Sequence, residues 1–155
     1  MLHLVLYQPE IPPNTGNIIR LCANTGTTLH LIEPLGFELD DKRLRRAGLD
    51  YREFATVRRH PDLAAFRAQQ EPGQRLFGIS TRASLPHHQA RFIPGDALML
   101  GPETRGLPEA VLDALGPQHC LRIPMQQDSR SLNLSNAAAV VLYEALRQLG
   151  DPGLS

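Results

Sequence analysis

Two short apolar runs near the N-terminus place the strongest constraint on the fold. Residues 2–7 and 28–32 are each long enough for a buried strand, and each is followed by a polar residue and a proline, which favours the end of a strand. Between them, Asn14 or Thr15 can cap a helix that Gly26 ends. A strand, a helix and a second strand in this order form a βαβ unit, and such units build parallel sheets. The sequence therefore predicts an α/β fold.

The rest of the chain continues this pattern. Its 155 residues suit one compact domain that spans residues 1–155. Further strands are expected at residues 53–57, 75–80, 97–100 and 120–123. Further helices are expected near residues 43–47, at 61–70, after Pro108, and in a long final segment that ends before Gly150. A loop is expected at residues 83–95, and the sequence does not reveal its role.

Composition argues against several classes of protein. Hydrophobic residues make up 42% of the chain, and no apolar run approaches the roughly 18 residues of a membrane span. No secretory signal pattern is visible at the N-terminus, so the expected compartment is the cytoplasm. Cys22 and Cys120 are expected to be buried hydrophobic residues, and the scattered histidines are expected in surface loops. No zinc-protease, P-loop or dinucleotide motif is present, and no metal is expected.

Charge is distributed unevenly along the chain, although the formal net charge is zero. Residues 42–60 contain seven basic side chains and only two acidic ones. Such a stretch is either a solvated helix face or a surface that contacts phosphate groups. The residues alone leave both interpretations open.

Three polar segments each border an apolar run. They are Asn14-Thr-Gly-Asn-Ile-Ile-Arg-Leu-Cys-Ala-Asn24, Leu98-Met-Leu-Gly-Pro-Glu-Thr-Arg-Gly-Leu-Pro108 and Arg122-Ile-Pro-Met-Gln-Gln-Asp-Ser-Arg-Ser-Leu-Asn-Leu-Ser-Asn136. The third segment joins a strand end, a polar loop and a helix start within about fifteen residues. Its hydroxyl and amide groups should therefore converge beside an apolar wall, which is how a small-molecule pocket is built.

These three segments, in this order, resemble the signature motifs of the SPOUT class of RNA methyltransferases, and the match spans almost the whole chain. Residues 4–13 and 40–51 are similar to one subfamily in particular, which methylates the ribose 2'-hydroxyl of the wobble nucleotide, cytidine or uridine 34, in leucine tRNAs. The resemblance implies a homodimer that takes S-adenosylmethionine and tRNA and needs no metal. It also implies a C-terminal deep trefoil knot in a cofactor-binding part of about residues 75–150, where connection rules alone favour an unknotted chain.

The resemblance also implies roles for individual residues. S-adenosylmethionine is expected to contact Ile79, Gly101, Ile123, Ser131 and Leu132. The expected catalytic residues are Arg20, Ser131 and Asn133, of which the last two orient the ribose hydroxyl. A guanidinium group has a pKa above about 12, so we expect Arg20 to stabilise the developing alkoxide through its charge rather than to act as a base. The alternative for Arg20 is a structural ion pair, with Glu103 as a possible partner.

Other residues are expected to shape the site or to contact RNA. Asn14, Asn24, Glu103 and Arg130 are second-rank site candidates, and Glu103 is a candidate proton acceptor. RNA contacts are expected from Lys42, Arg43, Arg45, Arg46 and Arg130. The final helix is apolar on nearly every face between residues 134 and 146, so it should pack against a second copy of the chain. Three rival functions stay open: methylation of another tRNA or ribosomal RNA site, catalytically silent RNA binding, and methylation of a small molecule.

Overall fold

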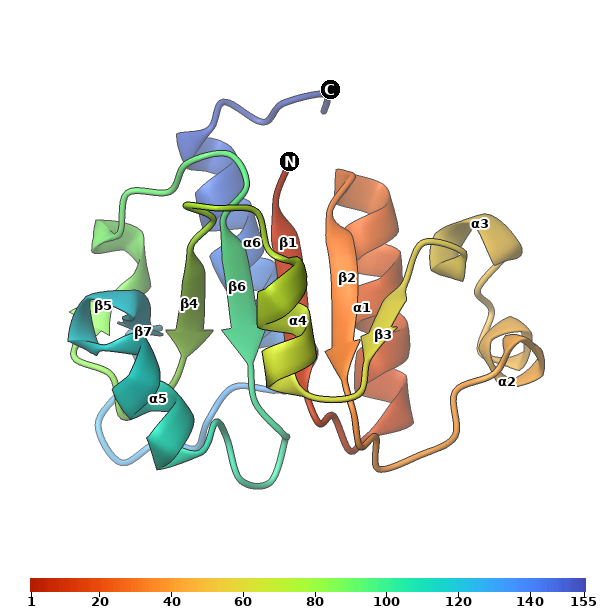
Figure 1. Ribbon diagram of the computed structural model, residues 1–155, viewed down its shortest axis with the longest axis horizontal. Coiled ribbons are helices and arrows are strands. Elements are labelled where there is room, and N and C mark those ends of the chain that lie inside the picture. Colours follow the sequence, from red (N-terminus) through yellow and green to blue (C-terminus); the bar gives the residue numbers. More distant parts are fainter.

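The computed structural model describes all residues, 1–155, as a seven-stranded sheet flanked by helices (Figure 1). The strands are β1 (His3–Tyr7), β2 (Thr28–Ile32), β3 (Arg58–His60), β4 (Leu76–Ile79), β5 (Leu85–Pro86), β6 (Ala97–Leu100) and β7 (Cys120–Arg122). The helices are α1 (Pro12–Thr25), α2 (Asp41–Arg46), α3 (Tyr51–Phe54), α4 (Leu63–Gln69), α5 (Glu109–Leu115) and α6 (Leu134–Gln148), with two 3-10 helices, η1 (His87–Gln89) and η2 (Pro117–His119). All strand pairs are parallel, in the order β3-β2-β1-β6-β4-β7-β5, which confirms the α/β prediction.

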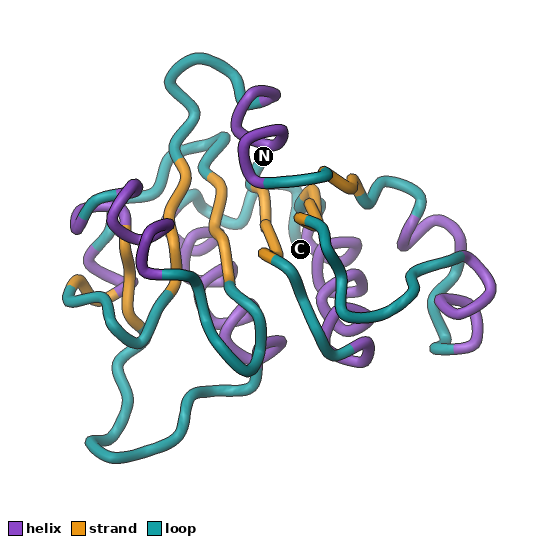
Figure 2. The backbone as a smooth tube through the Cα atoms, turned by 60° about the horizontal axis from the view of Figure 1, so that its bottom comes forward, coloured by secondary structure: helices purple, strands orange, loops and turns teal.

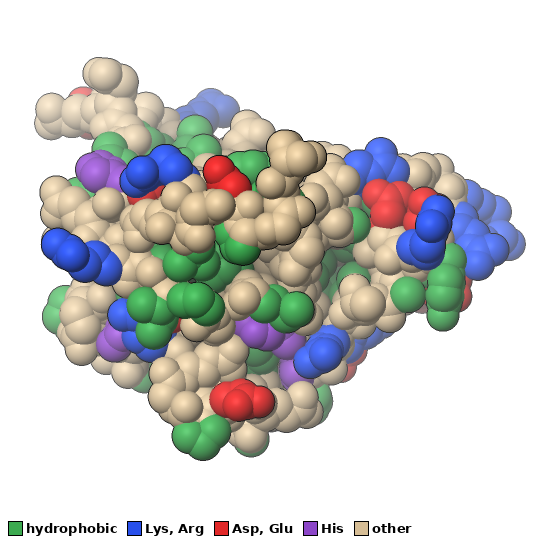
Figure 3. All heavy atoms as spheres, turned by 90° about the horizontal axis from the view of Figure 1, so that it is seen from above, with side chains coloured by type: hydrophobic (Ala, Val, Ile, Leu, Met, Phe, Trp, Pro, Cys, Tyr) green, Lys and Arg blue, Asp and Glu red, His purple; other side chains and the backbone are tan.

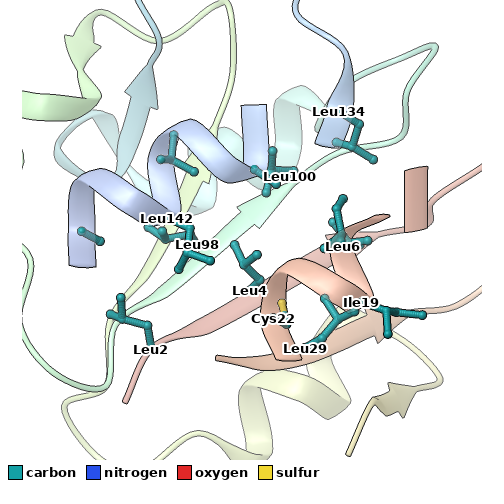
Figure 4. Close-up of a cluster of buried hydrophobic side chains, with 14 of the residues drawn as sticks. Leu2, Leu4, Leu6, Ile19, Cys22, Leu29, Leu98, Leu100, Leu134 and Leu142 are labelled. Carbon is teal, nitrogen blue, oxygen red and sulfur yellow. The ribbon is translucent and has the colours of Figure 1, made fainter. Parts of the chain in front are cut away.

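Helices cover both faces of this sheet. In Figure 1, α4 and α5 lie in front of the sheet, whereas α1 and α6 lie behind it. Successive residues of a strand point to opposite faces. Leu4 and Leu6 of β1 therefore join a cluster of 23 buried residues shared with α1 and α6, while Val5 joins a cluster of 7 on the other face. Figure 4 shows the larger cluster, in which Leu4 and Leu98 fill the space between the sheet and its helices.

One expected strand and the start of one expected helix differ from the structure. The strand expected at residues 53–57 is wrong: residues 51–54 form α3, and β3 follows it. The reason is a reciprocal capping box, in which the Glu53 amide donates to the Asp50 carboxylate over 3.1 Å and the Asp50 amide donates to the Glu53 carboxylate over 2.9 Å. Helix α1 begins at Pro12 rather than at Asn14 or Thr15, because a proline in the first turn loses no intrahelical hydrogen bond.

The segment expected to be a loop at residues 83–95 contains β5 and η1. Strand β5 extends the sheet by pairing with β7. Gln148 of α6 fastens the rest of the segment: its side chain accepts from the Phe92 amide over 2.9 Å and donates to the Ala90 carbonyl over 2.9 Å. The segment therefore ties the C-terminal half of α6 to the edge of the sheet.

Three histidines form a hydrogen-bonded row across neighbouring strands, which corrects the expectation that histidines lie in surface loops. His3 Nδ1 and His30 Nε2 are 3.0 Å apart, and His30 Nδ1 and His60 Nε2 are 2.9 Å apart. Only 5% of His30 and 3% of His60 is exposed, and Phe66 of α4 packs edge-on against both rings. Burial, followed by the nearby His3, His60 and Arg58, lowers the pKa of His30 to about 3.

Both cysteines are free and buried, as expected. Burial raises the pKa of the Cys22 thiol to about 12, so this side chain behaves as a small hydrophobic residue of the core. None of the helices combines the length and the apolar character that crossing a membrane requires.

Candidate cofactor and substrate site

The carboxyl ends of β4, β6 and β7 open onto a cavity of about 450 Å³, which we call the strand-end cavity. Ligands of parallel α/β sheets commonly bind at this end of the strands, where loops replace the regular backbone. Figure 2 brings this end of the molecule forward and shows the loops that gather there. The cavity wall comes from the segments after β4, β6 and β7, from the start of α1 and from the start of α6.

All the residues expected to contact the cofactor line this cavity. Ile79 is the last residue of β4, Gly101 directly follows β6, and Ile123 directly follows β7. Ser131 and Leu132 come from the loop before α6. Two of the three expected catalytic residues, Ser131 and Asn133, lie here as well. The three sequence segments thus meet around one hollow because their strands end at the same edge of the sheet.

Gly101 is required by the loop that follows it. A Cβ atom at this position would lie 2.3 Å from the Leu107 amide nitrogen and 2.4 Å from the Gly106 carbonyl carbon. The loop therefore turns back against Gly101 so closely that no side chain fits between the two backbone segments. Gly106, with a φ of 69°, makes this return possible. The glycine sets the shape of the cavity wall.

A hydrogen-bonded chain joins all three motif segments at the cavity. The Glu103 carboxylate accepts from the amides of Glu10 and Ile11, each over 2.8 Å, and from Asn14 Nδ2 over 3.2 Å. Asn133 Nδ2 in turn donates to Asn14 Oδ1 over 3.1 Å. Asn133 also caps α6, since its Oδ1 accepts from the Ser135 amide over 2.9 Å. The side chain of Asn133 is therefore held in one orientation by groups from distant parts of the chain.

A second link fixes the loop after β6 to the loop after β1. Glu10 accepts from the Thr104 amide over 2.9 Å and from the Thr104 hydroxyl over 2.7 Å. These two hydrogen bonds, the backbone one first, lower the pKa of Glu10. Glu10 is not among the residues expected from the sequence, because nothing in its own segment indicates that its partner lies more than ninety residues away.

Arg20 does not line the strand-end cavity of its own chain. Its Nε lies 2.7 Å from Glu53 Oε2, and its Nη2 donates to the Gly48 carbonyl over 2.6 Å and to Glu53 Oε1 over 3.2 Å. The partner of Arg20 is thus Glu53 rather than Glu103. The hydrogen bond to Glu53 and the negative charge of that carboxylate raise the pKa of Arg20. About half of the Arg20 side chain, 51%, is exposed to solvent.

The basic residues expected to contact RNA lie at the α2 end of the molecule, apart from Arg130 in the loop before α6. Figure 3 shows lysine and arginine side chains gathered at the end that carries α2 and α3. Arg43 pairs with Glu38 over 2.9 Å and with Asp40 over 3.1 Å. Lys42, Arg45 and Arg46 of the same helix form no ion pair. Two second-rank candidates, Asn24 and Arg130, are exposed and do not line the cavity.

One cavity residue was not expected from the sequence. Arg82 lines the cavity just beyond β4 and donates to the backbone carbonyl of Leu107. It thereby links the segment after β4 to the end of the loop after β6. No motif surrounds Arg82, and its only signal in the sequence is its place shortly after a predicted strand.

The chemistry of the cavity fits a nucleoside-like cofactor. Apolar side chains from Ile79, Ile123 and Leu134 stand beside the hydroxyl of Ser131 and the backbone of the loop at Gly101. Apolar surface of this kind accommodates a flat ring, and peptide groups and hydroxyls suit the edge of an adenine and a ribose. The structure contains no cluster of three or more histidine, cysteine or acidic side chains placed to bind a metal ion.

Comparison with known proteins identifies the class to which this fold and site belong. Residues 1–143 match the SpoU rRNA Methylase family, and the chain belongs to that family. A tRNA (cytidine(34)-2'-O)-methyltransferase from Escherichia coli strain K12 is 63% identical over 153 residues, which cover 99% of this chain and 97% of that protein. A relative from Saccharophagus degradans with the same name is 60% identical and covers 99% of both chains.

Solved structures agree with this assignment. A structure described as giving insights into the 2-OH methylation of C/U34 on tRNA is 51% identical, with a TM-score of 0.88 over 97% of each chain. The SpoU methyltransferase AviRb from Streptomyces viridochromogenes, solved in complex with AdoMet, is 28% identical, with a TM-score of 0.79 over 96% of this chain and 58% of that one. The fold is therefore that of a SpoU methyltransferase.

Proposed function

We propose that this chain transfers a methyl group from S-adenosylmethionine to the ribose 2'-hydroxyl of nucleotide 34 in tRNA. The observation that carries the proposal is the 63% identity, over nearly the full length of both chains, to a tRNA (cytidine(34)-2'-O)-methyltransferase. The strand-end cavity supports it, because residues of all three motif segments line that one hollow. We propose leucine tRNAs as the substrates, in the cytoplasm, as the sequence resemblance implies.

The cofactor is proposed to occupy the strand-end cavity, held by Ile79, Gly101, Ile123, Ser131 and Leu132. When bound, S-adenosylmethionine supplies an electrophilic methyl group on a sulfonium. Ser131 and Asn133 then hold the ribose hydroxyl by hydrogen bonds, and alignment of reacting groups lowers the barrier by removing the entropy of their encounter. Asn14 and Glu103 act one step further away, since they hold Asn133 in place.

Arg20 is proposed to stabilise the alkoxide that develops as the hydroxyl loses its proton. Glu53 raises the pKa of Arg20 further above its already high value, so the guanidinium stays charged and a role as a base is disfavoured. Glu103, whose carboxylate lines the strand-end cavity, is proposed as the eventual acceptor of that proton. Preorganised positive charge at a developing oxyanion is among the largest contributions to catalysis.

We further propose that the enzyme works as a homodimer. Helix α6 buries one face in the core but leaves Val140 and Tyr143 exposed by 41% and 49%, respectively. Apolar side chains adjoining one another on a helix favour a subunit interface. A second copy also accounts for the position of Arg20, which lies outside the cavity of its own chain and would complete that of its partner. Sedimentation at micromolar concentration tests the dimer, and a folded, active monomer would contradict it.

The C-terminal trefoil knot is also a proposal, within a single domain of residues 1–155 whose knotted part covers about residues 75–150. It is supported by the order of the sheet, in which β7 pairs with both β4 and β5 before the chain continues into α6 behind the sheet. Extension of single molecules by their two ends tests it. A knotted chain reaches a shorter final length than an unknotted chain of 155 residues, because the tightened knot retains some of the backbone.

Ribose-methylation mapping of total tRNA from cells with and without this chain tests the proposed activity. We expect one 2'-O-methyl group, at nucleotide 34 of leucine tRNAs, to disappear with the chain and to return with the unmodified gene. A variant in which both Ser131 and Asn133 are replaced by alanine serves as the matched control and should not restore the methyl group. Loss of a methyl group from ribosomal RNA or from another tRNA position would contradict the proposed substrate.

A further inference from the structure

We propose that a second hollow in the molecule binds one unstacked base of the substrate RNA, an inference that rests on the proposed function. This hollow, the arginine-lined pocket, has a volume of about 340 Å³ and shares no lining residue with the strand-end cavity. Its wall comes from α1, from the segment between β2 and α2, and from α2 itself. The volume lies in the range of pockets that bind small organic groups.

One stripe of α1 forms a side of the pocket. Pro13, Gly16, Asn17 and Arg20 all line it, and their spacing of three and four residues places them on the same helix face. The face is the outer one, since Pro13, Asn17 and Arg20 are exposed while Ile18 and Ile19 are buried in the core. Arg20, the residue proposed for catalysis, therefore also lines this pocket.

Two arginines of the pocket are held in position and still have donors to offer. The Nε and Nη2 atoms of Arg20 are engaged by Glu53 and the Gly48 carbonyl, and those of Arg43 by Asp40 and Glu38. The Nη1 atom of each guanidinium makes no hydrogen bond or ion pair within the chain. Guanidinium groups with a free edge bind phosphate and other anionic oxygens well.

The charges around the pocket favour an anionic polymer as the ligand. The acidic neighbours Glu38, Asp40 and Glu53 are each engaged by an arginine of the pocket. Lys42, Arg45 and Arg46, on the helix that also contributes Arg43, have no carboxylate partner. Basic side chains without partners next to a pocket attract the phosphate backbone of RNA.

The remaining walls suit a base better than an aliphatic chain. Phe37 lines the pocket together with Leu39 and Leu44, and Asn17 adds an amide that can both donate and accept hydrogen bonds. Proteins that bind single-stranded RNA place splayed bases against aromatic side chains and contact their edges with amides. An aromatic wall, an amide and two guanidinium groups together meet these requirements.

Gly16 supports a ligand in this pocket by a separate argument. Glycine inside a helix is unfavourable relative to alanine, so its presence calls for a reason. Packing within the chain supplies none, since a Cβ at Gly16 would have no atom of this chain within 4 Å. The open space in front of Gly16 is the pocket itself. A glycine here keeps that space free.

Filling the pocket from Gly16 is the first test. Gly16→Leu should weaken binding of a synthetic anticodon stem-loop RNA about 10-fold, the size expected when one base can no longer stack on the protein. Its thermal stability should not fall below that of the parent, and its S-adenosylmethionine affinity should be unchanged. Ala23→Leu is the matched control, because Ala23 is exposed on the same helix but lines neither hollow. Undiminished RNA affinity of Gly16→Leu would overturn the proposal.

An abasic scan of the RNA loop is the second test. Each loop nucleotide is replaced in turn by an abasic one, and binding is measured with the parent, with Phe37→Ala and with the control Tyr51→Ala, an exposed aromatic residue outside the pocket. At one position, removal of the base should weaken the parent and Tyr51→Ala about 10-fold and leave Phe37→Ala unaffected. Equal reductions for all three proteins at every position would overturn the proposal.

Two further outcomes are distinguishable. If Gly16→Leu changes the sedimentation of the protein while Ala23→Leu does not, a second copy of the chain covers the pocket and the proposal fails. If the parent protein does not methylate nucleotide 34 at all, the proposed function fails, whatever the abasic scan shows. If the parent protein methylates nucleotide 34 but Phe37→Ala shows no base-specific effect, the proposed base-binding role of the pocket fails and the proposed function stands.

Discussion

The strand-end cavity and the arginine-lined pocket are built in different ways. The strand-end cavity is formed mainly by loops directly after parallel strands, whose positions are fixed by the buried sheet. The arginine-lined pocket is formed by the outer face of α1 and by short elements around α2, with side chains held by ion pairs. The first suits a ligand whose position must be exact, and the second suits adaptable contacts with RNA. Variants that change one of them and leave the other intact therefore test whether the first binds the cofactor and the second binds RNA.

The largest effect is expected on the rate of methyl transfer, from replacing Arg20. Such a variant distinguishes the chemical step from cofactor binding. Arg20→Ala should lower the rate of methyl transfer about 100- to 1000-fold, the usual reduction when one preorganised donor to an oxyanion is removed. Its S-adenosylmethionine affinity should stay the same, since Arg20 is proposed to contact the ribose oxygen and is not among the residues proposed to hold the cofactor. Single-turnover methylation and calorimetry measure the two quantities.

The Arg20→Lys variant distinguishes charge from base catalysis. Lysine keeps the positive charge but loses the planar fork, so this variant should retain more activity than Arg20→Ala and far less than the parent. Because the pKa of lysine, about 10.4, lies below that of arginine, a catalytic base at this position would gain activity steeply as the pH rises from 7 to 9. A flat profile supports the electrostatic role, and a steep rise limited to the lysine variant would contradict it.

The next effect concerns the wall of the strand-end cavity. Gly101→Val should weaken S-adenosylmethionine binding about 10- to 100-fold, because a side chain at this position forces the loop at Gly106 and Leu107 away. Calorimetry measures the change in affinity, and circular dichroism checks that the fold persists. Binding of an anticodon stem-loop RNA should change less, since only the target ribose is proposed to contact this cavity, through Ser131 and Asn133, while the proposed phosphate contacts lie on α2. Equal reductions of cofactor and RNA affinity would break the contrast between the two hollows.

A smaller, salt-dependent effect is expected at the basic helix. Replacing Lys42, Arg45 and Arg46 together by glutamine should weaken tRNA binding about 10-fold and lower the salt slope by about one for each phosphate group that the variant no longer neutralises. Cofactor affinity should be unchanged. Arg43→Gln alone should have a smaller effect on the salt slope than the triple variant, because it removes one basic side chain rather than three and two of its nitrogens are already engaged by Glu38 and Asp40. An unchanged salt slope in the triple variant would show that this helix is only a solvated face.

The smallest expected effect is on the pH dependence of the free energy of unfolding, through His30 in the sheet beneath α4. Its pKa of about 3 in the folded chain is below the ordinary value of 6.5, so the unfolded chain binds the proton more readily. The resulting stabilisation is present above pH 6.5 and is lost as the pH falls toward 3, with a slope of at most about 1.4 kcal/mol per pH unit. Urea unfolding between pH 7 and 4 should show a weaker slope in His30→Asn. The control His88→Asn, at an exposed site, should keep the parent's slope.

The sequence predicted the strand-end cavity better than any other part. Residues 28–32 and 97–100 form strands with the expected bounds, because short segments rich in apolar residues favour a buried strand. Once strands are placed in a parallel sheet, the residues after them must meet at one edge. Ile79, Gly101 and Ile123 line the cavity for this reason.

Features that depend on partners distant in the sequence could not be predicted in the same way. The ion pair of Arg20 with Glu53 requires α3, which forms through a capping box where the apolar pattern favoured a strand. The arginine-lined pocket requires α1 and α2 to stand at a particular distance, which no local pattern encodes. The histidine row requires the register of three strands, and isolated histidines in a sequence do not reveal it.

Methylation of a defined RNA by the purified protein tests the central claim most directly. Unmodified leucine tRNA is incubated with the protein and S-adenosylmethionine, digested with ribonuclease, and examined by mass spectrometry. We expect a single added methyl group on the ribose of nucleotide 34, absent when that nucleotide carries a 2'-deoxyribose. A methyl group on a base or at any other nucleotide, or methylation that persists with the deoxyribose substrate, would contradict the proposed activity.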